Sequence, residues 1–284
     1  ATASRKKEQQ ICACKVLLKG RVAPHVQANI VKEMLKYVMF QRNQIPMAYE
    51  QMKYEYQQQS CSNVPKNGER KGVRELTSTA YKRLGQLITT MEEHLSNLDS
   101  LFTLSVVPRV LILLGATAVS PKEVHEIVFT NQASVHNSSL TDLRTKQCIR
   151  ALMRTLIADS SIWEAKQLPI TNTLLLVRAH RNSGLAWFEP KIALKVPTRG
   201  QLYRCEIHCG QADCSNGCPG DGELDEGNDK RPGGCSGACE EIGAAASGES
   251  MAESDDYIWY QSPIPIKGVP AFATKSPASS DIWA

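Results

Sequence analysis

The sequence predicts an α+β fold in which helices pack on one face of a mainly antiparallel sheet. Long helical patterns come first along the chain and most strand patterns follow them, without the regular alternation that builds a doubly wound sheet. Of the 284 residues, 42% are hydrophobic and 22% are charged, which is typical of a folded globular protein. A chain of this length buries a sizeable apolar core whether it forms one large domain or two small ones.

Two long helices are predicted in the first half of the chain. The first spans residues 24–42, with Pro24 in the favoured first turn and Pro46 beyond its end. The second spans about residues 74–101, and a polar loop over residues 57–72 separates the two. Apolar residues recur at spacings of three and four along each helix, which indicates a core-facing stripe. The stripe residues are Val26, Ile30, Val31, Met34, Leu35 and Val38 in the first helix, and Leu84, Ile88, Met91, Leu95 and Leu98 in the second.

Strands are predicted from the middle of the chain onward. The run VVPRVLILL at residues 106–114 is continuous, rich in branched residues and closed by Gly115, which is typical of a buried strand. The motif SPKE at residues 120–123 could cap a helix, but the β-rich residues 124–129 favour a turn followed by a strand. Further strands are predicted at residues 173–179, 201–209 and 257–266.

A third helix, predicted over residues 140–158, has more apolar surface than a single core contact needs. At 100° per residue its apolar side chains cover about 180°, against the roughly 100° stripe of an ordinary surface helix. Met153 and Ile157 lie at the outer margin of this arc, beside Arg150 and Arg154. An apolar edge bordered by arginine predicts a recognition face, and the alternative is a deeply buried helix. The apolar residues are Cys148, Ile149, Leu152, Met153, Leu156 and Ile157.

Six cysteines fall within 35 residues near the C-terminal end of the chain. Their spacings of three and four residues are compatible with a metal site but not specific for one, and His208 is the only nearby imidazole. The surrounding residues 211–252 are rich in glycine and acids, which predicts a flexible insertion. A metal-binding interaction module therefore stays open as an alternative, while the preferred interpretation has no metal and no cofactor. The cysteines are Cys205, Cys209, Cys214, Cys218, Cys235 and Cys239.

Charge is unevenly distributed along the chain. Residues 211–256 contain 12 Asp and Glu against 2 Lys and Arg, which leaves 31 basic and 17 acidic residues elsewhere. A basic body is compatible with binding either nucleic acid or an acidic protein face. No run approaches the roughly 18 apolar residues of a membrane helix, so no membrane partner is expected.

Motifs that carry catalysis or nucleotide binding are missing from the sequence. It contains no P-loop, no dinucleotide fingerprint, no G-x-S-x-G elbow and no H-E-x-x-H, and its six histidines are scattered. A binding protein is therefore favoured over an enzyme.

Several long stretches resemble the comet-type family of proteins that bind mitotic arrest deficient protein two (Mad2). They are FQRNQIPMAYEQMK at residues 40–53, VPRVLILLG at 107–115 followed by SPKE, HRNSGLAWFEPK at 180–191 followed by VPTRG, and DYIWYQSP at 256–263. The resemblance implies a single HORMA-like domain over residues 23–268. Residues 1–22 are then expected to be a flexible N-terminal segment and residues 269–284 a flexible tail, and the insertion at 211–252 is longer than the family's connection.

The resemblance also implies a non-catalytic function. The protein would bind the closed form of Mad2 by mimicking its dimer partner and would present it to an AAA+ remodelling ATPase. The mitotic checkpoint complex would thereby be disassembled and the spindle assembly checkpoint silenced, in the nucleus and cytoplasm and at kinetochores and the spindle in mitosis. Nucleic acid is not expected as a partner on this interpretation, although a HORMA-like chromatin adaptor that uses the basic body is a further alternative.

Candidate site residues follow from the resemblance together with the wide apolar arc. The family's glutamine after the aromatic of the first helix corresponds to Gln41, and its aromatic on the third helix corresponds to Met153, which is a departure because methionine lacks a rigid ring. The family's contact with the ATPase corresponds to Pro190 and Lys191. The residues expected at the Mad2 surface are Gln41, Arg42, Ile149, Arg150, Met153, Arg154 and Ile157.

Overall fold

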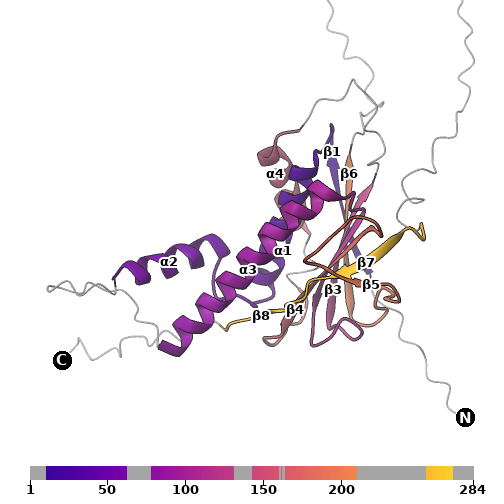
Figure 1. Cartoon of the computed structure of the whole chain (residues 1–284). Coiled ribbons are helices and arrows are strands. Elements are labelled where there is room, and N and C mark those ends of the chain that lie inside the picture. Colours follow the sequence, from indigo (N-terminus) through magenta and orange to yellow (C-terminus); the bar gives the residue numbers. More distant parts are fainter. Residues whose placement is uncertain are drawn as a thin grey trace, which may run out of the picture.

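The computed structural model describes residues 11–62, 78–130, 143–159, 161, 164–209 and 254–270 (Figure 1). The helices are α1 (Pro24–Gln41), α2 (Tyr49–Ser62), α3 (Ser78–Leu104) and α4 (Thr145–Ala158). The strands are β1 (Ile11–Leu18), β2 (Arg109–Leu114), β3 (Glu123–Thr130), β4 (Asn172–His180), β5 (Glu189–Lys191), β6 (Gln201–Cys209), β7 (Tyr257–Gln261) and β8 (Ile266–Lys267).

All eight described strands belong to one mixed sheet. Seven of them follow the order β1-β6-β3-β2-β4-β7-β5, and β8 pairs with β4 beside that path. The pairs β1–β6 and β3–β6 are parallel, and the other pairings are antiparallel. The prediction of an α+β fold with a mainly antiparallel sheet is therefore confirmed.

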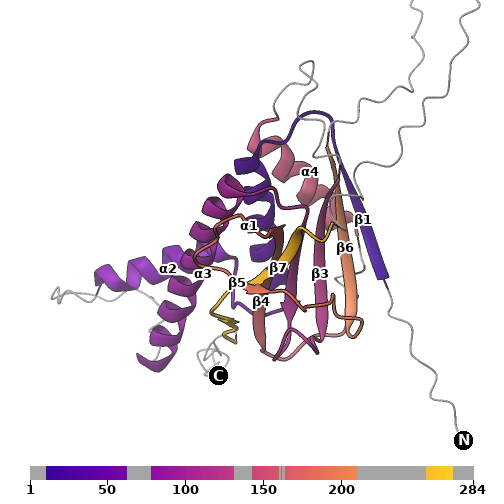
Figure 2. The same cartoon turned by 45° about the vertical axis from the view of Figure 1, so that its right-hand side comes forward.

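The helices cover one face of the sheet, as Figure 2 shows for α1, α3 and α4. Alternate residues of the central strands meet the apolar stripes of α1 and α3 there, and together they form the main core. The other face has a smaller apolar cluster around Leu111, Leu113 and Trp259, over which Leu194 and Val196 of the connection from β5 to β6 pack. Helix α2 extends away from the sheet beside α3.

Both long helices have the apolar stripes that their periodicity predicts, since every stripe residue named for them is buried. Helix α1 begins at Pro24, as predicted. It ends where Asn43 takes a φ of 53°, a left-handed conformation that asparagine tolerates better than most residues. The Gln44 N–H then donates to the carbonyl of Met39 at 2.8 Å, which satisfies one of the last carbonyls of the helix.

Two predicted segments at the N-terminal side of the chain differ in the structure. Ile11–Leu18, expected within a flexible segment over residues 1–22, forms strand β1, in which Val16 and Leu18 are buried. The strand escaped prediction because its inward positions begin with two cysteines, so the alternation of large apolar and polar residues is weak. Helix α2 includes residues 57–62 of the predicted loop, and residues 63–72 of that loop lie outside the described part.

Three further boundaries also differ. Helix α4 begins at Thr145, and residues 143–144 are not helical, while residues 140–142 lie outside the described part. The strand predicted over residues 257–266 is split into β7 and β8, because two prolines between them cannot donate ladder hydrogen bonds. Val269, placed in the predicted tail, is buried and donates its N–H to the carbonyl of Gln44 at 2.8 Å. Among the helices of the described residues, none is long and apolar enough to cross a membrane.

Candidate protein-binding surfaces

Helix α4 lies at one edge of the sheet, where it packs against β1 and α1. Two hydrogen bonds align it with α1: the Leu143 N–H donates to the carbonyl of Arg21 at 3.0 Å, and the Tyr37 hydroxyl donates to the carbonyl of Leu156 at 3.2 Å. The first joins the two helix beginnings and the second the two helix ends. The helices therefore run parallel, and the end of α1 lies beside the end of α4.

The side chains of α4 form three lengthwise rows that differ in burial. Cys148, Leu152 and Leu156 are at most 1% exposed and belong to the main core. In the next row Ile149 and Met153 are half-buried, and Ile157 is 62% exposed. The third row contains Arg150 and Arg154, both exposed. The apolar arc of the helix therefore extends beyond the core contact, and the alternative of a deeply buried helix is wrong.

Gln41 is placed close to this face by the helix that it ends. It follows Tyr37 by four residues, so the two side chains lie on the same side of α1. Because the Tyr37 hydroxyl contacts the end of α4, the half-buried Gln41 lies near that end as well. Its neighbour Phe40 is 42% exposed.

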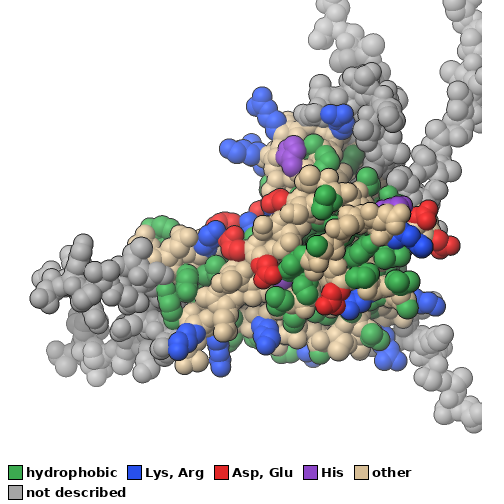
Figure 3. Space-filling view, in the orientation of Figure 1, with side chains coloured by type: hydrophobic (Ala, Val, Ile, Leu, Met, Phe, Trp, Pro, Cys, Tyr) green, Lys and Arg blue, Asp and Glu red, His purple; other side chains and the backbone are tan. Residues whose placement is uncertain are grey.

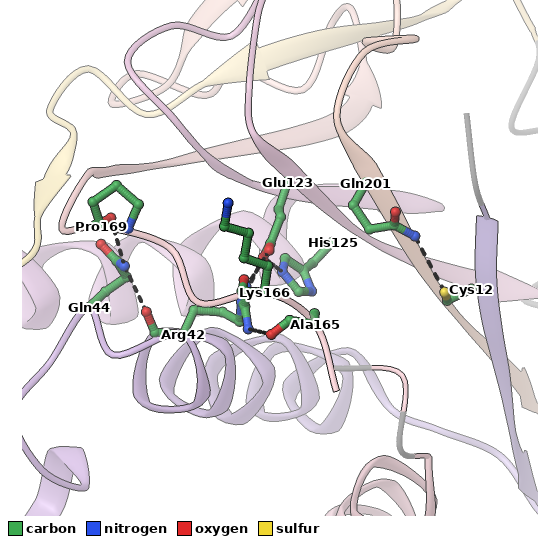
Figure 4. Close-up of polar contacts among 9 residues, drawn as sticks. All are labelled: Cys12, Arg42, Gln44, Glu123, His125, Ala165, Lys166, Pro169 and Gln201. Carbon is green, nitrogen blue, oxygen red and sulfur yellow. Dashed lines mark hydrogen bonds and ion pairs between the residues drawn. The ribbon is translucent and has the colours of Figure 1, made fainter. Parts of the chain in front are cut away.

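Arg42, which the sequence interpretation placed on the Mad2 surface, belongs to the interior. It is 2% exposed, and its guanidinium forms a two-pronged ion pair with Glu123, with Nε to Oε2 at 2.9 Å and an Nη to Oε1 at 2.5 Å (Figure 4). The remaining donors reach the carbonyls of Ala165 at 3.5 Å and Lys166 at 2.5 Å. One buried cation thus connects the end of α1, the start of β3 and the connection between α4 and β4.

His125 completes the buried cluster around Glu123. Its Nε2 lies 3.4 Å from Glu123 Oε2, and its ring stacks on Tyr203 with centroids 4.8 Å apart. Burial lowers the pKa of His125 and outweighs the opposing effect of Glu123, so the imidazole is neutral. Burial alone would raise the pKa of Glu123, but hydrogen bonds from His125 and Arg42 hold it below its usual value. The carboxylate therefore stays ionised beside the guanidinium.

Gln44 extends this internal support. Its Oε1 accepts a hydrogen bond from the Thr171 N–H at 2.8 Å, and its Nε2 donates to the carbonyls of Arg42 at 2.8 Å and Pro169 at 3.4 Å. Together with Arg42, it holds the chain that leads from α4 into β4. Sequence reasoning missed Gln44, Glu123 and His125, because partners this far apart in the chain share no spacing that would reveal them.

Pro190 and Lys191 lie in β5, the short strand at the opposite edge of the sheet. Pro190 is exposed, and the Lys191 ammonium pairs with Glu189 Oε2 at 2.9 Å. The preceding aromatics anchor the strand: Phe188 is buried, and the Trp187 Nε1–H donates to Glu93 Oε1 at 2.8 Å. The segment is therefore an edge strand, which was not among the predicted strands, and it lies between the two predicted at residues 173–179 and 201–209.

The cysteine cluster does not form a common site in the described residues. Cys205 and Cys209 are buried in the main core beneath α4, and Cys14 is the register partner of Cys205 on β1. The hydrogen bond with Cys14, together with burial, raises the pKa of Cys205, which keeps its thiol protonated. Cys214, Cys218, Cys235 and Cys239 lie outside the described residues. Within the described ranges, no group of three or more His, Cys, Asp or Glu side chains is arranged to hold a metal ion.

Comparison with known proteins gives matches that cover most of the chain. The family model described as "p31comet: Mad1 and Cdc20-bound-Mad2 binding" matches residues 2–221. The human MAD2L1-binding protein is 32% identical over 261 residues, which span 90% of this chain and 80% of the human protein. The mouse MAD2L1-binding protein is 31% identical over 255 residues, which span 89% of this chain and 77% of the mouse protein.

Proposed function

Since the chain belongs to the p31comet family, described by its binding of Mad1- and Cdc20-bound Mad2, we propose that it is a non-catalytic adaptor for the closed form of Mad2. It binds closed Mad2 by mimicking a Mad2 dimer partner and presents it to an AAA+ remodelling ATPase. The outcome is disassembly of the mitotic checkpoint complex and silencing of the spindle assembly checkpoint. The protein acts in the nucleus and cytoplasm, and at kinetochores and the spindle in mitosis.

The observation that carries this proposal is the partly uncovered apolar row of α4. Ile149, Met153 and Ile157 continue the apolar arc past the core, and Gln41 lies at the end of the neighbouring helix α1. A row of this kind loses water contact when a partner covers it, and burial of an apolar side chain contributes about 1.5–3 kcal/mol. Arg150 and Arg154 border the row, which suits the rim of a protein interface.

The proposal is tested by the double substitution Met153→Glu with Gln41→Ala. A carboxylate at position 153 would have to lose its water in the complex and would replace an apolar contact, so affinity for closed Mad2 is expected to fall more than about tenfold, since each 1.4 kcal/mol is a decade. Titration calorimetry with closed Mad2 measures the effect. Val119→Glu is the matched control, because Val119 is 82% exposed in the turn between β2 and β3. The affinity of this control variant for closed Mad2 should equal that of the wild type.

Circular dichroism and thermal melting establish that the double variant is folded. Met153 is only half-buried, so the monomer should accept the glutamate with little loss of stability. A folded double variant that binds closed Mad2 as tightly as the Val119→Glu control would refute the proposed interface.

A further inference from the structure

A row of cations runs along the exposed side of α4. Lys146, Arg150 and Arg154 are spaced by four residues, so they project from one side of the helix, and Arg144 stands at its N-cap. All four side chains are exposed, and none makes an ion pair with another residue in the described ranges. The helix itself contains no Asp or Glu.

This arrangement of cations destabilises the helix. Like charges four residues apart on a helix repel each other, and both Lys146–Arg150 and Arg150–Arg154 are such pairs. Arg144 and Lys146 also lie at the helix beginning, where the backbone dipole disfavours cations, and the Arg144 side chain makes no capping hydrogen bond there. Folding therefore does not account for these cations, and residues that break local rules are concentrated at functional sites.

Lys146, Arg150 and Arg154 stand directly beside the apolar row of Ile149, Met153 and Ile157, so the outer face of α4 has two parallel stripes, and Arg144 precedes the cation stripe at the N-cap. In Figure 3, Lys and Arg side chains project at the upper end of the molecule, where Figure 1 places α4. A membrane-bound helix would need a wide apolar face, whereas this apolar row is narrow and partly covered. Three of the four cations are arginine, whose planar guanidinium pairs with carboxylates in a two-pronged geometry. The combination fits an acidic protein surface better than lipid.

We propose that the partner docked on α4 presents a patch of Asp and Glu to Arg144, Lys146, Arg150 and Arg154, and that this pairing steers association. The inference rests on the proposed function for the identity of the partner, closed Mad2. The apolar row supplies contacts that persist in the complex, while the cation row accelerates encounter and sets the rotation of the partner about α4. Exposed charges act mainly on the association rate, and salt screens them over roughly 10 Å at 0.1 M.

The test measures association and dissociation rates of the full chain with closed Mad2 by stopped-flow at 50, 150 and 500 mM NaCl, a range over which the screening length falls from about 14 Å to about 4 Å. The association rate constant is expected to fall at least about tenfold across this range, with the dissociation rate changing less than about threefold. Arg144→Gln with Lys146→Gln should lower association about threefold or more at 50 mM NaCl and have little effect at 500 mM.

The matched control is Lys195→Gln with Arg199→Gln, which removes the same net charge from exposed positions of the connection between β5 and β6. If net charge alone mattered, the two pairs would act equally, and that result would overturn the proposal. Association that is fast and independent of salt would also overturn it, while leaving Mad2 binding intact. Absence of binding at every salt concentration would instead refute both the proposed function and the acidic partner.

Two other ligands give distinct outcomes in the same variants. The wild-type chain could be retained on duplex DNA or on anionic lipid vesicles. If the variant Arg144→Gln with Lys146→Gln lost this retention while its Mad2 rates stayed unchanged, the cations would be assigned to DNA or lipid, and the acidic protein patch would be overturned. Equal retention of wild type and variant, together with slower Mad2 association by the variant, would support it.

Discussion

At the scale of single residues, Gln41 and Arg42 are neighbours in the chain with different environments. Gln41 is half-buried on the side of α1 that faces the end of α4, and Arg42 is buried against Glu123. A helix turns about 100° per residue, so consecutive side chains point in different directions. The motif that brought both residues to attention could not separate a surface role from an internal one. Arg42 acts through the residues it positions, because its guanidinium holds the chain after α4 by the carbonyls of Ala165 and Lys166.

Arg42→Met is expected to lower the free energy of unfolding by about 3–5 kcal/mol, because it leaves the buried Glu123 carboxylate without its cation. Urea unfolding measures this change. Gln41→Ala, one residue earlier, should change stability by less than about 0.5 kcal/mol and serves as the control. If Arg42→Met were as stable as wild type yet lost Mad2 binding, the guanidinium would have to contact the partner directly.

At the scale of elements, β1 supports the candidate Mad2 surface. It is the edge strand beneath α4, and its inward residues Val16 and Leu18 are 2% and 4% exposed in the main core. Its outward residue Leu17 is 59% exposed. The three-row pattern of α4 depends on this neighbour, because the sheet edge decides how much of the apolar arc is covered. The remainder of the arc is what a partner can reach.

Val16→Ala is expected to lower the free energy of unfolding by about 1–2.5 kcal/mol, since it removes two buried methyl groups and leaves a cavity. Leu17→Ala in the same strand should stay within about 0.5 kcal/mol of wild type, because Leu17 is exposed. Chemical denaturation of both variants gives the comparison. Equal effects of the two substitutions would mean that residues 11–18 do not pack as a strand in solution.

At the scale of the whole molecule, the two candidate surfaces lie at opposite edges of the sheet. Helix α4 covers β1 at one end of the strand order, and Pro190 and Lys191 form β5 at the other end. Neighbouring strands lie about 4.8 Å apart, so the six intervals from β1 to β5 separate the edges by roughly 30 Å. One surface can therefore stay accessible while the other is occupied, which an adaptor between two partners needs.

Pro190→Ala with Lys191→Glu is accordingly expected to leave the affinity for closed Mad2 within a few fold of wild type and to abolish stimulation of the AAA+ ATPase. Pro190 and Lys191 lie in an exposed edge strand far from α4, so reversing the charge there should not alter the Mad2 surface. The measured quantity is the rate at which closed Mad2 is converted to the open form with ATPase and ATP. Conversion at the wild-type rate would remove β5 from the proposed ATPase contact.

The sequence by itself determined the α+β class, the two long helices and the central buried strands, because apolar periodicity records which side of an element faces a core. It also indicated that α4 has more apolar surface than a core contact requires. The comparisons establish the p31comet family, and the mixed sheet with its helices agrees with the HORMA-like fold expected from the resemblance.

Only the tertiary structure decided which part of each face is covered. It shows that β1 forms the sheet edge and that Arg42, expected at the surface, is buried. It also shows that Ile157 and the cations of α4 are exposed. These outcomes depend on contacts between segments far apart in the chain, such as Arg42 with Glu123 and β1 with β6. Periodicity reports the side of a helix or strand that avoids water, but the neighbour that excludes the water is set by packing, and so is the surface left for a partner.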